Sequence, residues 1–234
     1  ESVSGCVQKD GRTTILLEFA AHESYFVVFR SKDSSSPEID PISAKTAKTV
    51  NVSGPWLIDF KPAREDEEDF VIQSDTLFYW HKSSLEKIKS FSGTAIYQTN
   101  INLPDNWQKE GARIILDLGT VPGQFEVKGK DIRENVYDAL CAEITINDKS
   151  GGVLWCSPYR VDVTGFLQPG INRISIAVTN TLHNWRIANQ FCAGASKFLN
   201  NNVPRDPHAW ELIGLAFPPS PSGLPGPVKL MLEK

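Results

Sequence analysis

The alternation of side chains in residues 92–104 constrains the fold of this chain more than any other feature of its sequence. The odd positions carry mostly apolar side chains, and they are Ala95, Tyr97, Thr99, Ile101 and Leu103. The even positions from 98 to 102 carry amides. A repeat of two residues is typical of a strand with one buried face and one solvated face. The sequence therefore predicts a half-buried β-strand here.

Similar runs recur at short intervals along the rest of the chain. They cover residues 113–118, 142–147, 159–164, 173–179 and 228–232. Turn-forming residues lie between them, in 104–106, 109–111, 147–152 and 168–172. Only residues 75–90 and 184–198 are candidates for helices, and both stretches are short. Many short strands joined by such turns predict an all-β sandwich or barrel.

The N-terminal region has a different character. Residues 14–18 and 24–30 are β-like runs separated by a polar break, which predicts a β-hairpin. The next residues are rich in serine, proline and charge, and they suit an exposed linker. We therefore expect residues 1–30 to be a hairpin from the tail of a preceding β-domain. Residues 31–47 would be a linker, and residues 48–234 a sandwich.

Composition excludes several classes of function. The 234 residues are enough for one substantial core, and the formal net charge is only −4. This mild charge gives no basic footprint for a phosphate backbone, so nucleic acid is not an expected partner. The sequence also lacks a run of about 18 apolar residues, so we expect no membrane span.

The four cysteines leave their own state open. Cys6, Cys141, Cys156 and Cys192 are widely spaced and show no paired C-x-x-C pattern, which argues against a structural zinc site. Free thiols and one or two disulfides are both compatible with the sequence. Because Glu1 follows no apolar signal core, we expect a mature form or an excised fragment.

An ordered series of short motifs resembles a known family. The motifs lie in residues 52–56, 91–97, 115–119, 142–147, 152–160 and 169–180. Together they are similar to the galactose-binding-like sandwich of family 2-type glycoside hydrolases, and most of all to the C-terminal sandwich of the α-L-rhamnosidase family, glycoside hydrolase family 106. The chain departs from that pattern in residues 122–140, which are inserted, and in residues 180–186.

This resemblance implies a jelly-roll β-sandwich with a galactose-binding domain-like fold. It also implies a non-catalytic accessory domain, because the catalytic acids of such enzymes belong to a barrel domain. The partners would be that barrel domain of the parent chain and carbohydrate from plant or host polysaccharide. The parent protein would be a secreted or periplasmic glycoside hydrolase.

The residues themselves suggest no catalytic site. Glycosidases mostly need two facing carboxylates, but the acidic run 65–69 is typical of a solvated loop. Four scattered histidines without a G-x-S-x-G elbow give no nucleophilic triad. We expect no cofactor. A structural calcium held by Asp59, Asp117 or Asp162 is possible, but a chain without a functional metal is the simpler expectation.

Two local clusters have the composition of a sugar contact, which combines an aromatic platform with planar hydrogen-bonding groups. The predicted carbohydrate-binding residues are Trp155, Tyr159, Arg160, Asn180, Asn184, Trp185 and Arg186. We expect Trp56 and Trp155 to pack in the core or between domains. Trp185, which lies in a polar loop, is expected to be exposed.

Three functions remain open at this point. The chain could be an accessory sandwich that packs on a catalytic domain. It could instead be an autonomous carbohydrate-binding module, for which a millimolar to micromolar affinity is expected. A self-sufficient hydrolase is the third alternative, and turnover of aryl-glycosides by the chain alone would reveal it.

Overall fold

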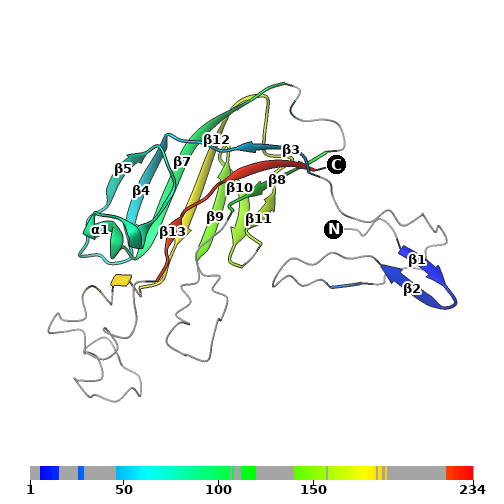
Figure 1. Cartoon of the computed structure of the whole chain (residues 1–234), viewed down its shortest axis with the longest axis horizontal. Helices are drawn as coiled ribbons and strands as arrows, with labels where there is room; N and C mark the ends of the chain where they lie inside the picture. Colours follow the sequence, from blue (N-terminus) through cyan, green and yellow to red (C-terminus); the bar gives the residue numbers. More distant parts are fainter. Residues whose placement is uncertain are drawn as a thin grey trace, which may run out of the picture.

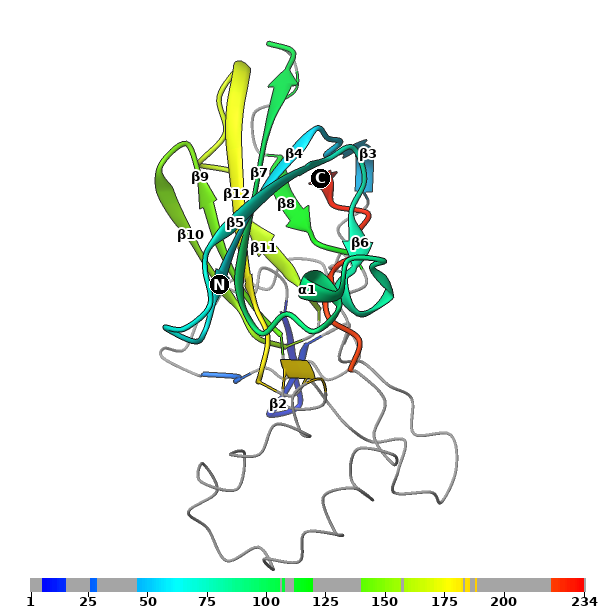
Figure 2. The same cartoon turned by 90° about the vertical axis from the view of Figure 1, so that its left-hand side faces the viewer.

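The computed structural model describes residues 6–15, 26–28, 46–105, 107, 112–119, 140–156, 158–182, 184–185, 188 and 220–233. Almost all of the regular structure in these residues is β-strand, in two larger and two smaller antiparallel sheets. Figures 1 and 2 show the two larger sheets as separate layers. The predicted all-β sandwich is therefore confirmed.

The larger layer is a six-stranded sheet. Its strands, in spatial order, are β10 (Lys149–Leu154), β9 (Cys141–Ile146), β12 (Gly170–Thr179), β7 (Gly93–Leu103), β4 (Trp56–Pro62) and β5 (Phe70–Ser74). The long strands β7 and β12 pair over their whole common length, from Gly170 opposite Leu103 to Thr179 opposite Thr94. This central pair sets the register for the strands on both sides.

The second layer is a four-stranded sheet. Its strands, in order, are β11 (Arg160–Asp162), β8 (Arg113–Asp117), β14 (Lys229–Glu233) and β3 (Thr46–Asn51). At one end of the sandwich β13 (Gly223–Leu224) pairs with β6 (Phe78–Tyr79). The region 75–90 contains the helical elements η1 (Trp80–Lys82) and α1 (Glu86–Lys89), so it holds single turns rather than a long helix.

The core lies between the two layers, and the period-two pattern decides which side chains enter it. On β7, Ala95 and Tyr97 are fully buried, whereas Gln98 and Asn100 face solvent. An aromatic cluster fills one end of the core, formed by Trp56, Phe60, Phe70, Trp80, Phe91 and Tyr97. Within it the Trp80 Nε1–H donates to the Tyr97 hydroxyl at 2.6 Å. The expectation that Trp56 packs in the core is confirmed.

The N-terminal hairpin differs from the predicted one. Strand β1 (Cys6–Lys9) pairs with β2 (Arg12–Ile15), whereas residues 26–28 are described without strand structure. The expected pairing of residues 14–18 with 24–30 stays a prediction, because most of both runs lies outside the described residues. Asp10 and Gly11 have φ angles of 52° and 71°, and an Asp-Gly turn with two positive φ angles closes a two-residue hairpin. The Asp10-Gly11 dipeptide was therefore a stronger sequence signal for a hairpin than the polar break after residue 18.

A second turn is also shorter than predicted. Residues 147–152 were expected to form a turn, but only Asn147 and Asp148 form it, with φ angles of 50° and 64°. Lys149 already begins β10. The strands β4 and β5, absent from the predicted set, pair with each other and complete the six-stranded sheet.

Several expectations fall largely outside the described residues. They are the linker 31–47 up to the start of β3 at Thr46, the insertion 122–140 except Leu140, and most of the helix candidate 184–198. None of the helices in the described ranges is long and apolar enough to cross a membrane.

Candidate functional site

The residues predicted to contact carbohydrate lie in two regions. The first, here called the corner, joins residues 180–182 and 184–185 to residues 64–67, 91–93 and 220–222. The second, here called the connector, is formed by residues 154–156 and 158–160 between β10 and β11. The two regions use their polar side chains differently.

Asn180 fastens the corner to the start of β7. Its side-chain Nδ2 donates to the Phe91 carbonyl at 2.9 Å, and its Oδ1 accepts from the Gly93 backbone N–H at 2.9 Å. The Asn180 backbone N–H also donates to the Gly93 carbonyl at 3.1 Å. Asn180 is buried, so its amide replaces the solvent that these backbone groups would otherwise need.

Asn184 fastens the same loop to residues before β13. Its Nδ2 donates to the Ser220 carbonyl at 2.9 Å and to the Ser222 hydroxyl at 3.1 Å. Its Oδ1 accepts from the Ser220 backbone N–H at 2.7 Å. Asn184 is only 2% exposed. The two asparagines thus clamp the loop between segments that lie far apart in the sequence.

Trp185 packs under the loop that follows β4. The Arg64 guanidinium carbon lies 4.3 Å from the centre of the indole ring, and the indole Nε1–H donates to Glu67 Oε1 at 2.6 Å. The Trp185 backbone N–H donates to the Ser92 hydroxyl at 3.1 Å. These contacts leave the ring half-buried, so Trp185 is less exposed than expected.

The Arg64 guanidinium over the Trp185 ring is paired with a carboxylate. Arg64 Nη2 donates to Asp66 Oδ2 at 2.5 Å. This bond raises the pKa of Arg64 and lowers the pKa of Asp66 from their ordinary values. Residues 65–69 are exposed, as expected for a solvated acidic loop. The positive charge of Arg64 is therefore paired with Asp66 while the guanidinium lies over the Trp185 ring.

The residues predicted to contact sugar at the corner differ in how far they reach the surface. Asn180 and Asn184 use their amides inside the protein, so Trp185 and its neighbours Arg64 and Glu67 provide the outer surface of this region. Arg186 lies outside the described residues. Sequence reasoning missed Arg64 and Glu67 because the contact from Glu67 to Trp185 spans 118 positions and leaves no local pattern.

The connector presents an aromatic side chain to solvent. Trp155 is 72% exposed, so it does not pack in the core of the described residues, and its packing between domains stays a prediction. The ladder between β10 and β9 ends at Leu154, one residue earlier, so Trp155 lies outside the paired strands. An exposed indole at a strand end provides a flat apolar surface of the type that sugars stack on.

Tyr159 and Arg160 attach the other end of the connector. Tyr159 is buried, and its hydroxyl donates to the Leu140 carbonyl at 3.3 Å. Arg160 Nε donates to Asp117 Oδ2 at 2.9 Å, while half of the Arg160 side chain stays exposed. Tyr159 is thus a structural residue, whereas Trp155 and Arg160 are available at the surface.

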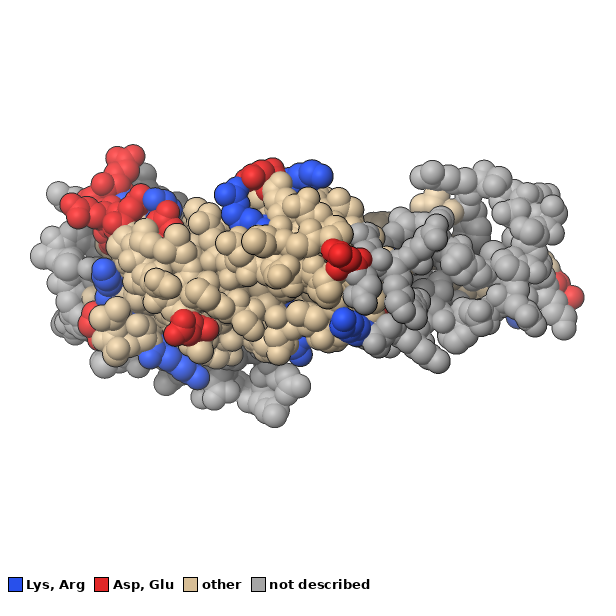
Figure 3. Space-filling view, turned by 90° about the horizontal axis from the view of Figure 1, so that it is seen from above, with Lys and Arg blue, Asp and Glu red and all other residues tan. Residues whose placement is uncertain are grey.

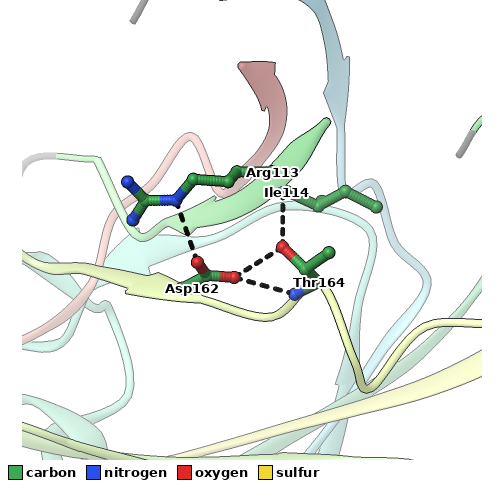
Figure 4. A network of polar contacts seen from close by, with 4 residues as sticks. All are labelled: Arg113, Ile114, Asp162 and Thr164. Atoms are coloured by element: carbon green, nitrogen blue, oxygen red, sulfur yellow. Dashed lines mark hydrogen bonds and ion pairs between the residues drawn. The ribbon is translucent and has the colours of Figure 1, made fainter. Parts of the chain in front are cut away.

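Beside the connector, Asp162 joins β11 to β8 (Figure 4). Its Oδ1 accepts from the Thr164 hydroxyl and backbone N–H at 2.6 and 3.0 Å, and its Oδ2 accepts from Arg113 Nε at 3.0 Å. Partial burial raises the pKa of Asp162, but the Thr164 hydrogen bonds and the Arg113 charge outweigh it, so the pKa lies below its ordinary value.

The three candidate calcium ligands are all engaged by protein donors. Asp59 pairs with Lys61 at 3.0 Å, Asp117 with Arg160, and Asp162 with Arg113. Among the described residues no three His, Cys, Asp or Glu side chains gather in a way that could hold a metal ion. We therefore assign no metal ligand in the described part of the chain.

Charged side chains of the described residues are dispersed over the face shown in Figure 3. On the face shown in Figure 3 they gather in separate groups, the most acidic of them at one end, with uncharged residues between the groups. This pattern agrees with the small net charge of the chain. It gives the drawn, described residues of this face no continuous basic patch.

The chain is similar to parts of known glycoside hydrolases. The chain is similar to the solved structure of a rhamnosidase from Novosphingobium sp. PP1Y, with 25% sequence identity and a TM-score of 0.55. The match covers 85% of this chain and 16% of the rhamnosidase. A β-D-glucuronidase of Dictyoglomus thermophilum also matches over 60% of this chain and 21% of its own, with 16% identity and a TM-score of 0.39.

A curated protein of Formosa agariphila, named "Putative beta-glucuronidase", is 26% identical over 97% of this chain. The chain spans 19% of the length of that protein. No protein-family profile matches the sequence. The relatives are thus glycoside hydrolases of both rhamnosidase and glucuronidase type, and this chain corresponds to a small part of each.

Proposed function

We propose that this chain is a non-catalytic accessory sandwich of a larger glycoside hydrolase of the α-L-rhamnosidase type. The observation that carries this proposal is the asymmetry of coverage: 85% of this chain matches only 16% of the rhamnosidase. A region of that size is one domain of a multi-domain enzyme. Function in such a domain comes from its surface contacts rather than from its fold.

The finer assignment rests on the motifs in the sequence. Their order supports a galactose-binding-like jelly roll at the C-terminal side of a family 106 enzyme, with residues 1–30 as the tail of a preceding β-domain, 31–47 as a linker and 48–234 as the sandwich. We further propose a secreted or periplasmic parent enzyme that acts on plant or host polysaccharide. Its catalytic barrel domain would be the partner of this sandwich.

The two surface regions suggest a division of roles. The corner is clamped by Asn180 and Asn184, so it provides a rigid surface around Trp185. The connector exposes Trp155 and half of Arg160. We assign the connector to contact with carbohydrate or with the catalytic domain, because a large exposed indole beside a partly exposed guanidinium suits both.

The test compares this chain with the complete gene product. Both proteins are assayed on aryl α-L-rhamnosides and aryl β-D-glucuronides under the same conditions. We expect turnover by the complete protein and none by the chain alone. Turnover by the purified 234-residue chain would overturn the proposal, and so would a complete gene product that contains no further domain.

An autonomous carbohydrate-binding module is the second candidate, and the exposure of Trp155 is the observation that favours it. Tryptophan fluorescence is followed while rhamnose, galactose and pectic oligosaccharides are titrated into wild type, Trp155→Ala and Trp185→Ala. Millimolar to micromolar binding corresponds to about 4 to 8 kcal/mol and requires a preformed site. Binding lost in Trp155→Ala would support a module. Identical titrations for all three proteins would exclude both tryptophans as contacts.

A further inference from the structure

The register of the β9–β10 hairpin brings two cysteines together. Ala142 on β9 lies opposite Leu154 on β10, and this is the last pair of the antiparallel ladder. Cys141 directly precedes Ala142, and Cys156 follows Leu154 by two residues. A continued ladder would set Cys141 opposite Trp155, one position before Cys156. Paired Cα atoms lie about 4.5 to 5.5 Å apart and one position along a strand adds about 3.4 Å, so the Cα atoms of Cys141 and Cys156 are expected about 6 Å apart. Disulfides span Cα separations of about 4.4 to 6.8 Å, and the bend at Cys156 takes its side chain out of the strand alternation.

Tyr159 gives a second, independent indication that the two thiols are close. Its hydroxyl donates to the carbonyl of Leu140, the residue before Cys141. The pKa of Tyr159 is raised by burial and further by the charges of Cys156 and Cys141. Both cysteines therefore lie near the same hydroxyl group, although fifteen positions separate them in the sequence.

The two thiols differ in accessibility. Cys156 is exposed, Cys141 is half-buried, and both are free thiols in the structure. Cys156 lies beyond the last ladder pair, so sheet hydrogen bonds do not hold its backbone. We propose that Cys141 and Cys156 form a reversible disulfide at the base of the β9–β10 hairpin, and that Cys156 is the thiol that meets the oxidant.

The reaction is an exchange with an external disulfide such as oxidised glutathione. The Cys156 thiolate attacks one sulfur of that disulfide, forms a mixed disulfide and releases one thiolate. The Cys141 thiolate then attacks the Cys156 sulfur, forms the internal S–S bond and releases the second thiolate. The chain loses two electrons and two protons, and the external disulfide is reduced to two thiols.

The bond would act on the connector. Trp155 lies between Leu154 in the ladder and Cys156, so an internal disulfide fixes the backbone on both sides of the exposed indole. Oxidation would thereby restrict the surface that Trp155 presents. Reduction would free it.

The experiment uses the full chain in a Cys6→Ser/Cys192→Ser background, which leaves only these two cysteines. The reduced protein is treated with oxidised glutathione, the remaining thiols are alkylated, and the products are identified by mass spectrometry before and after proteolysis. We expect a product that is lighter by two hydrogens, carries no alkyl group and yields a peptide linking Cys141 to Cys156. Its urea midpoint should lie above that of the reduced protein.

Single variants separate the order of events. With Cys141→Ser we expect stable glutathione on Cys156, because the second exchange cannot occur. With Cys156→Ser we expect little modification of the less accessible Cys141. Glutathione that remains on Cys156 beside a free Cys141 thiol would refute the internal bond, and so would two free thiols after treatment. In the unsubstituted chain, pairing of Cys156 with Cys6 or Cys192 would refute it as well.

Discussion

The corner and the connector have similar amino-acid compositions, but they differ in how their polar groups are used. In the corner the amides of Asn180 and Asn184 bind backbone groups of distant segments. In the connector Trp155 faces solvent and Arg160 makes one ion pair at the surface. Aromatic and amide residues near strand ends are therefore not by themselves a ligand site. Their burial decides whether they hold the fold or meet a partner.

The largest expected effect comes from the corner. Asn184→Ala removes an amide that makes three hydrogen bonds to residues 220–222 and leaves their buried partners unsatisfied. We expect the free energy of unfolding to fall by about 3 kcal/mol, measured by urea denaturation. Asn100→Ala, at an exposed position of β7, is the matched control and should cost less than about 0.5 kcal/mol. Equal losses of unfolding free energy in Asn184→Ala and Asn100→Ala would show that the hydrogen bonds of Asn184 do not cause the loss.

The hydrogen bond from Trp185 to Glu67 should contribute less to stability than the amide of Asn184. Trp185→Phe keeps an aromatic ring but removes the N–H that donates to Glu67, and we expect a loss of about 1 kcal/mol in unfolding free energy. Glu67→Gln retains an acceptor oxygen and should cost less. A double-mutant cycle with Trp185→Phe and Glu67→Ala measures the coupling, and additive effects would contradict a direct contact.

Lowering the pH tests the contacts of Asp162 between β11 and β8, beside the connector. Because the pKa of Asp162 is lowered in the folded state, its carboxylate stabilises the fold above the unfolded pKa, and this contribution is lost as pH falls through the folded pKa. Asp162→Asn should therefore lower the free energy of unfolding at neutral pH by slightly less than ~1 kcal/mol. The difference in unfolding free energy between this variant and wild type should become smaller below about pH 4. Urea midpoints across this pH range provide the measurement. A difference in stability that stays constant with pH would mean that the charge of Asp162 does not stabilise the fold.

The ion pair of the connector should contribute less. Arg160→Met keeps much of the apolar stem but removes the donor to Asp117, and the pair is partly exposed. We expect a loss of about 0.5 kcal/mol at low salt that disappears in about 1 M salt. The same variant in an Asp117→Asn background should show no further loss.

The smallest effect on stability is expected for Trp155→Ala. The ring is mostly exposed, so its removal should change the unfolding free energy by less than about 0.5 kcal/mol. Any effect on ligand or partner binding would then be a surface effect. A loss comparable to that of Asn184→Ala would place Trp155 with the structural residues instead.

The fold could be predicted because strand alternation is local. Residues 92–104 predict β7 within one residue at each end, and the buried face contains the expected Ala95 and Tyr97. Strand β4 was missed although Trp56, Ile58 and Phe60 alternate with more exposed neighbours. The turn at residues 147–148 was predicted too long because Gly151 and Gly152 are strand residues of β10, and Gly152 follows a register shift.

The candidate site was less predictable because its contacts are long-range. Nothing near Asn180 indicates that its partners are Phe91 and Gly93, and nothing near Trp185 indicates Glu67. Trp155 was expected in the core or between domains because tryptophan is usually buried, but the β9–β10 ladder ends one residue before it and the ring is exposed in this chain. Tertiary pairing, which short patterns do not encode, decided each case.

The hydrogen bonds of Asn180 and Asn184 have a practical consequence for hydrogen-exchange measurements. The backbone N–H groups of Gly93 and Ser220 donate to these two side-chain amides, from which they are 87 and 36 positions away in the sequence. Local opening of the corner would release both N–H groups, whereas the ladder between β7 and β12 can stay closed. The exchange rates of Gly93 and Ser220 therefore report on the corner separately from the sheet.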